Sequence, residues 1–195
     1  LRREVREVLL SAEGNVRLNL DLGYVESRKL VVAAGAWSHR FTAQLGVSIP
    51  LETERGYHVT IAHPEVLPSH VIMEAERKFV ATPMEIGLRF AGTAELAGLE
   101  APPNYERAEI LLRLGKRMFP GISGTEKTEW MGHRPSLPDS RPVIGKCPVA
   151  PNVLFAFGHG HRGLIGAPMT GEIISDLMAN RPPKIDITPF RPERF

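Results

Sequence analysis

Short apolar runs broken by glycine and proline recur along the chain of 195 residues. Residues 16–20 alternate between apolar and polar positions and lead into Asp21 and Gly23, which predicts a strand entering a hairpin. Residues 30–34 are apolar throughout, as in a strand whose two faces are both covered. Gly35 ends this run, and residues 36–45 can form a short helix. The N-terminal part is therefore predicted to contain a strand, a glycine turn and a helix in succession.

The middle of the chain changes to short alternating runs at residues 57–61, 79–82 and 87–91. Such runs, separated by proline and glycine, predict an antiparallel sheet. Asn104 can cap a helix that extends to about residue 118 before Pro120 stops it.

The last third begins with a stretch rich in glycine and proline at residues 132–142. Residues 152–157 then predict a strand, residues 158–163 a turn, and residues 166–180 a helix. The proline-rich tail from Arg181 is expected to lack regular structure. With no internal repeat, this order of elements predicts a mixed α/β fold.

The composition excludes some classes of binding partner but does not identify a function. The chain is 43% hydrophobic and 24% charged, and its net charge of +2 is too small to imply nucleic acid or an anionic membrane. Cys147 is the only cysteine, so no internal disulfide forms, which fits a reducing compartment. No run approaches the ~18 apolar residues that span a bilayer. We expect a cytoplasmic protein, with peripheral attachment to the inner face of the membrane as an alternative.

One glycine-rich motif carries candidate chemistry. Residues 158–163 read GHGHRG and satisfy G-x-G-x-x-G between a predicted strand and a predicted helix, as in a dinucleotide fingerprint. About 32 residues follow Gly163, most of them helix and tail, so no second strand of a parallel unit is available. We therefore interpret the glycines as letting the backbone approach a flat ligand, whose electron-rich edge meets free N–H groups at the helix start.

Simpler interpretations stand beside this one. His159 and His161 suggest a metal, but no matching cysteine or acidic cluster accompanies them. We expect Trp37 and Trp130 to anchor the core rather than stack on a ligand, and Arg55 to be solvated. Cys147 lacks the surroundings of a catalytic thiol.

Four blocks of sequence resemble the C-terminal portion of the D-amino-acid oxidase family. They are VVAAGAWS at 31–38, GTAELAG at 92–98, the block at 130–145, and the turn at 158–160 continuing to APMTGE at 167–172. Within the family they are most similar to bacterial D-amino-acid dehydrogenases and to glycine or hydroxyproline oxidases. The blocks follow the family's order, and together they are specific.

The resemblance implies an FAD-binding Rossmann-like domain with an inserted antiparallel-sheet substrate domain. Residues 1–50 and 131–180 would belong to the former, residues 51–130 to the latter, and residues 181–195 to the tail. The implied reaction oxidises the C–N bond of a D-amino acid, or a related small amino acid, by hydride transfer to flavin. The electron acceptor is left open between oxygen and a quinone.

The resemblance also implies roles for particular residues. Ala33, Ala34, Gly35 and Trp37 would lie near the adenine of FAD. The pyrimidine side of the flavin would be wrapped by Gly158, His159, Gly160, Arg162, Gly163, Leu164 and Ile165. Gly132 stands near the position where sarcosine-oxidase-like relatives carry a cysteine that tethers FAD, so binding should be non-covalent.

Three residues are implied on the substrate side. Arg134 matches the family's arginine for the substrate carboxylate, which a guanidinium can hold through two parallel hydrogen bonds. His161 falls where glycine oxidases carry a further arginine, and Tyr57 begins a strand that would face the substrate.

One family feature has no counterpart before Val31. It is the N-terminal G-x-G-x-x-G and the acidic residue that hold the ADP half of FAD. We expect the missing half to belong to a longer protein or to a partner chain, and an oligomer is compatible with the sequence. Two alternatives stay open: a non-catalytic binding module, and a flavin or nicotinamide enzyme that binds pyrophosphate at residues 158–163.

Overall fold

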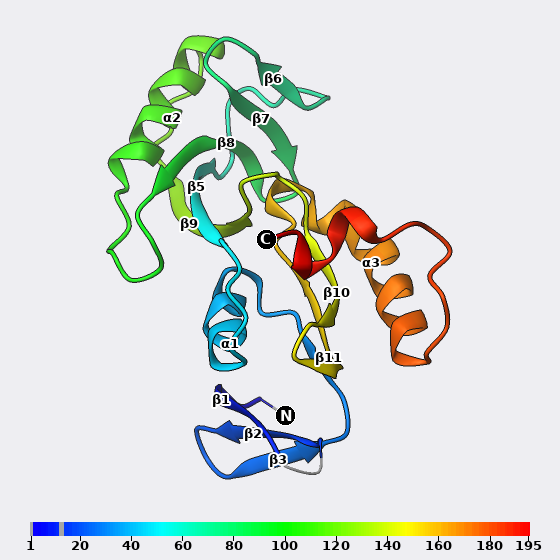
Figure 1. The fold of residues 1–195 in the computed structure, drawn as a ribbon. Coiled ribbons are helices and arrows are strands. Elements are labelled where there is room, and N and C mark those ends of the chain that lie inside the picture. The colour runs from blue at the N-terminus through cyan, green and yellow to red at the C-terminus, as the bar shows by residue number, and fades with distance from the viewer. Residues whose placement is uncertain (1, 12–13) are drawn as a thin grey trace. The chain divides into compact units, whose positions relative to one another are not determined.

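A computed structural model of the chain describes residues 2–11 and 14–195 (Figure 1). The chain forms two compact units, which we describe separately. The first unit joins residues 1–53 to residues 134–195, and the second is the continuous segment 54–133.

The first unit begins with an antiparallel sheet of three short strands. These are β1 (Val5–Leu10), β2 (Val16–Leu20) and β3 (Tyr24–Ser27), in the order β1-β2-β3. The hairpin predicted after residue 20 is confirmed, because β2 and β3 pair around Gly23, whose φ is +77°. Glycine adopts this left-handed conformation without the steric cost of a side chain.

A second sheet of the first unit carries the predicted strand, turn and helix. Its strands are β4 (Leu30–Val32), β10 (Val143–Cys147) and β11 (Ala150–Phe157), in the order β10-β11-β4. β11 pairs antiparallel with β10 and parallel with β4. β4 is thus an edge strand, and Leu30 and Val31 are only half-buried, so the expected burial on both faces is wrong for the described residues.

Helices and short 3₁₀ turns complete the first unit. They are η1 (Gly35–Trp37), α1 (Ser38–Gln44), η2 (Gly160–Arg162), α3 (Gly163–Met178), η3 (Thr188–Phe190) and η4 (Pro192–Arg194). α3 begins at Gly163, three residues earlier than predicted. The tail was expected to be irregular, but it contains the two turns η3 and η4, each with proline near its start.

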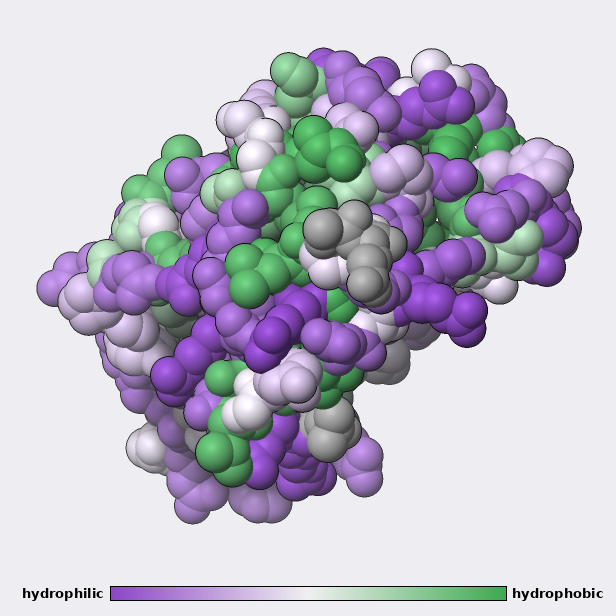
Figure 2. All heavy atoms as spheres, turned by 60° about the horizontal axis from the view of Figure 1, so that its bottom comes forward, coloured by the Kyte–Doolittle hydropathy of each residue, from purple (hydrophilic) through white to green (hydrophobic). Residues whose placement is uncertain are grey.

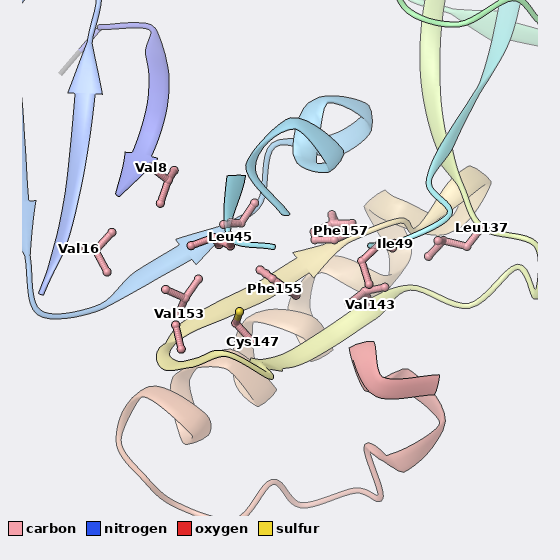
Figure 3. Packing of buried hydrophobic residues seen from close by; sticks show 12 residues of the cluster. Val8, Val16, Leu45, Ile49, Leu137, Val143, Cys147, Val153, Phe155 and Phe157 are labelled. Atoms are coloured by element: carbon pink, nitrogen blue, oxygen red, sulfur yellow. The ribbon is translucent and has the colours of Figure 1, made fainter. Parts of the chain in front are cut away.

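The core of the first unit joins the two sheets. Val153, Phe155 and Phe157 of β11 pack with Val8 and Val16 of the first sheet (Figure 3). On the other face, Ile144 of β10 packs with Ile173 of α3 and with the tail. Apolar side chains therefore cover both faces of the pair formed by β10 and β11.

The second unit is an antiparallel sheet with one helix. Its strands are β5 (Glu52–Ile61), β6 (Ile72–Glu74), β7 (Phe79–Met84), β8 (Gly87–Leu96) and β9 (Lys127–Ser136), in the order β6-β7-β8-β5-β9. The helix α2 (Glu106–Met118) packs on one face through Ala108, Leu111 and Leu112. The predicted sheet and helix are confirmed, whereas β9 was not predicted because its second half contains Gly132 and Pro135.

Candidate cofactor and substrate site

The turn from β11 to α3 is shaped by two glycines. Gly158 follows the last residue of β11 with φ at +82°, and Gly160 has φ at +54°. A Cβ atom at Gly158 would lie 2.5 Å from Cδ1 of Leu137. Only glycine therefore fits at residue 158 without moving the core, and the chain turns sharply into η2 and α3.

Apolar residues at the surface are common, and Figure 2 shows them interspersed with polar ones on one face. The start of α3 differs because Leu164 is 94% exposed and Ile165 is 83% exposed, next to a helix end with no side-chain cap. The backbone donors of this helix start, which the side chain of Arg162 does not cap, therefore adjoin exposed apolar side chains. This combination suits a flat apolar ring with a polar, electron-rich edge. The seven residues predicted to wrap the flavin all lie in this one turn.

His159 is the half-buried member of that turn. Its Nε2 lies 2.9 Å from Oγ1 of Thr170, two turns along α3. Burial lowers the pKa of His159 below its ordinary value of 6.5, which favours the neutral ring. His161, in contrast, is exposed on η2.

Three of the four residues predicted near the adenine line cavities of the first unit. Ala33 and Ala34 line an apolar cavity of about 280 Å³ together with Val31 of β4. Ala34 and Trp37 line a second cavity of about 610 Å³, whose wall also carries Arg40. Trp37 is exposed at this cavity, so its expected role as a core anchor is wrong. Gly35, at φ +55°, turns the chain from Ala34 into η1.

Arg134 and Gly132 lie on β9, and Arg134 is half-buried. Gly132 has a clear packing partner, because a Cβ atom there would lie 1.9 Å from the ring of Trp130. That indole is 55% exposed and stacks on His58 with ring centroids 5.0 Å apart. Trp130 was expected in the core and is instead a surface residue. A cofactor role for Gly132 stays a prediction.

Tyr57 has its hydroxyl occupied inside the second unit. The side chain is buried in the core under α2, and its O–H donates to Oε2 of Glu95 at 2.5 Å. The same oxygen accepts the backbone N–H of Asn104 at 2.9 Å. Burial and the Glu95 hydrogen bond raise the pKa of Tyr57 above 10.0. These contacts are structural, and the predicted substrate contact of Tyr57 stays a prediction.

Arg55 contradicts the expectation of a solvated side chain, since it is completely buried. Its guanidinium donates to the carbonyls of Gly98 and Ala101, each at 2.7 Å, and to that of Pro102 at 3.2 Å. Glu95 lies 3.8 Å away and balances the charge. The sequence held one signal, because Arg55 stands two residues before Tyr57 in a strand and so shares its buried face.

Other predicted classes of site can be checked directly. Over residues 2–11 and 14–195, no three metal-binding side chains gather into a site. The same residues include no helix with the length and apolar content to cross a bilayer. Cys147 is a free thiol in the core of the first unit, and burial raises its pKa above 9.0.

Comparison with known proteins decides the family. The sequence profile of the DAO family, described as FAD dependent oxidoreductase, matches residues 1–177. The chain belongs to this family. A D-amino-acid oxidase of Bradyrhizobium diazoefficiens is 43% identical over the whole chain, and D-amino acid dehydrogenase 1 of Mesorhizobium japonicum is 31% identical over 96% of it. The resemblance inferred from the four sequence blocks is confirmed.

The DAO-family fold is also confirmed by solved structures. Glycine oxidase of Geobacillus kaustophilus aligns with 99% of the chain at a TM-score of 0.88 and 24% identity. L-proline dehydrogenase of P. horikoshii aligns with 99% at a TM-score of 0.81 and 20% identity. The chain spans about half the length of the curated relatives it matches, 47% of the oxidase and 46% of the dehydrogenase.

Proposed function

We propose that the complete protein oxidises the C–N bond of a D-amino acid, or a related small amino acid, to an imino acid with FAD as oxidant. The turn at residues 158–165 carries this proposal, because it joins backbone donors without a side-chain cap to exposed apolar side chains at the start of α3. Family membership and the 43% identity to a protein named D-amino-acid oxidase support the same reaction class.

The residues present fit a flavin at this turn. Gly158 and Gly160 let the backbone come close, and Leu164 and Ile165 offer apolar surface to a ring. Bound FAD supplies the acceptor for a hydride from the substrate. The N–H groups and the dipole of α3 stabilise negative charge at the ring edge. The only cysteine, Cys147, is buried in the core, which favours non-covalent binding.

Arg134 is the proposed anchor of the substrate carboxylate. Its guanidinium would hold the two carboxylate oxygens through parallel hydrogen bonds and so fix the orientation of the α-carbon. A neutral amine can give up hydride without a protein base, so the chain needs no general base. Tyr57 is buried and its hydroxyl is already hydrogen-bonded to Glu95 and Asn104, which agrees with a reaction that uses no general base.

The ADP half of FAD would use the cavities beside β4. Their walls include Ala34 and Trp37, and Arg40 adds a cation next to the larger one. β4 also has one edge without a neighbouring strand among the described residues, and such an edge can accept a further strand. We propose that a nucleotide-binding segment, either in the same protein or in a partner, completes the fold here.

One observation favours a second candidate. Because the chain spans about half of its curated relatives, it could act as a non-catalytic binding module of such an enzyme. The two candidates differ in whether flavin binds at all.

The test is to purify the complete protein, record its absorbance spectrum, and assay amine oxidation with a panel of D-amino acids, L-amino acids and glycine. We expect a yellow protein whose flavin is released on denaturation. Arg134→Ala should raise KM for its substrates by a factor equivalent to about 2–5 kcal/mol. Arg134→Lys keeps the charge but loses the bidentate geometry, and should fall between wild type and Ala. A colourless protein that gains no absorbance with FAD would favour the binding module.

A further inference from the structure

His159 contacts both the turn and the helix that follows it. Its carbonyl accepts the N–H of Arg162 at 3.0 Å, which closes η2. Its side chain lies along α3, where a Cβ atom built at Gly163 would lie 3.6 Å from Cβ of His159 and one built at Gly166 would lie 3.5 Å from Cδ2 of the imidazole. With Thr170, these two glycines form a stripe spaced three and four residues apart on one face of the helix. One residue therefore joins η2 to two turns of α3.

The hydrogen bonds of Thr170 determine which nitrogen of His159 carries the proton. The Thr170 hydroxyl has a single proton, and it donates this proton to the carbonyl of Gly166 at 2.9 Å. Oγ1 must then act as acceptor toward His159, so Nε2 of the imidazole is the donor. Nδ1 is left with its lone pair. The ring is held in one orientation by a directed bond as well as by packing.

We propose that His159, held as its Nε2–H tautomer by Thr170, is the positioning residue that fixes the start of α3 against the flavin. This inference rests on the proposed function, because the flavin site at residues 158–165 belongs to it. The first N–H groups of α3 receive no side-chain cap from Arg162, so their direction depends on how the helix start is held. Small displacements at such a site have large effects, since about 1 Å can cost ~100-fold in rate.

Two pairs of variants in the complete protein test the bond itself. His159→Gln can place its amide N–H near the position of Nε2, whereas the shorter side chain in His159→Asn cannot reach Thr170. Thr170→Ser keeps the hydroxyl, whereas Thr170→Val removes it and keeps the shape. Ser175→Ala is the matched control, because it removes an exposed hydroxyl from the same helix. In each pair, one variant should behave as wild type and the other should not.

The first measurement is amide hydrogen exchange over residues 160–166, which requires no flavin. We expect His159→Asn and Thr170→Val to exchange about 3- to 10-fold faster than wild type, the range that one buried hydrogen bond supplies. His159→Gln, Thr170→Ser and Ser175→Ala should stay within about twofold. Wild-type exchange in both disruptive variants would overturn the anchoring role.

The second measurement is the flavin dissociation constant and midpoint potential of the same variants. Weaker flavin binding, by a similar factor, and a shifted potential in His159→Asn and Thr170→Val would support positioning. Faster exchange with unchanged affinity and potential would show that the bond is merely structural and would refute the inference. A wild-type protein that binds no flavin would instead overturn the proposed function, and the exchange data would still decide the anchor.

Discussion

The buried guanidinium of Arg55 allows a quantitative test of the second unit. Arg55→Met keeps most of the side-chain volume and removes three hydrogen bonds to carbonyls and the charge opposite Glu95. Three charge-assisted bonds at ~1.5–3 kcal/mol each set an upper range of ~5–9 kcal/mol. The exposed carbonyls of Ala101 and Pro102 regain water, so we expect a loss of ~3–5 kcal/mol, as when a buried ion pair is broken.

Urea unfolding followed by tryptophan fluorescence measures this loss. The two tryptophans lie in different units, so a Trp37→Phe background leaves Trp130 as the reporter of the second unit. With an m-value of ~2 kcal/mol per M, the midpoint should fall by ~2 M. The control is Arg107→Met, whose partly exposed pair with Glu95 should be worth less than ~1 kcal/mol. Equal midpoints for the two variants would refute the argument from burial.

Three further predictions follow from single contacts. The hydrogen bond from Tyr57 and the nearby arginines lower the folded-state pKa of Glu95 below 4.5. The ionised carboxylate therefore stabilises the fold above pH 4.5, and this stabilisation is lost as the pH falls through the lower folded-state pKa. The urea concentration at the unfolding midpoint should decrease once the pH is below about 4.5, and it should decrease less in Glu95→Gln. Burial and Arg89 lower the pKa of His58 below 6.5, so Trp130 fluorescence should show a transition with a midpoint below 6.5 as the stacked imidazole protonates. His58→Gln should abolish this transition, and a midpoint at or above 6.5 would contradict the effect of burial and Arg89 on the imidazole. Gly158→Ala should destabilise the first unit by at least ~1–2 kcal/mol, because residue 158 has a positive φ and its Cβ would meet Leu137. Gly171→Ala lies in α3, where its Cβ would meet no other atom, and should stabilise the unit by ~0.5–1 kcal/mol in the same urea denaturation assay.

The sequence predicted those elements whose local pattern and tertiary role agree. The turns at Gly23 and Gly35 and the end of the strand before Gly158 could be predicted because glycine stands where φ is positive. The apolar run at 30–34 predicted a strand but not its place at the edge of the sheet. β9 was missed because Gly132 and Pro135 look like breakers. Gly132 is instead explained by the indole of Trp130, which occupies the space of its Cβ and stacks on His58, a residue far away along the chain.

The candidate site residues also divide into those that could be predicted from neighbouring positions and those that depend on distant parts of the chain. Residues 158–165 are consecutive, so their clustering in one turn follows from the chain itself. Arg55 and Tyr57 depend on Glu95 and on the loop at 98–104, far away along the chain, so their buried network could not be read from neighbours. The charge of Arg55 suggested a solvated side chain. Its spacing of two residues from Tyr57 in a strand was the one indication that it shares the buried face of Tyr57.

The discontinuity of the first unit has a consequence for synthesis on the ribosome. The second unit is one continuous segment, so it can complete its contacts as soon as residue 133 has emerged. β4 must wait much longer, because its parallel partner β11 pairs Val153 with Leu30. Until then the apolar run at 30–34 has no partner strand from its own sheet. The first unit can therefore complete its sheet only after the second unit, which lies between its two segments in the sequence, has been synthesised.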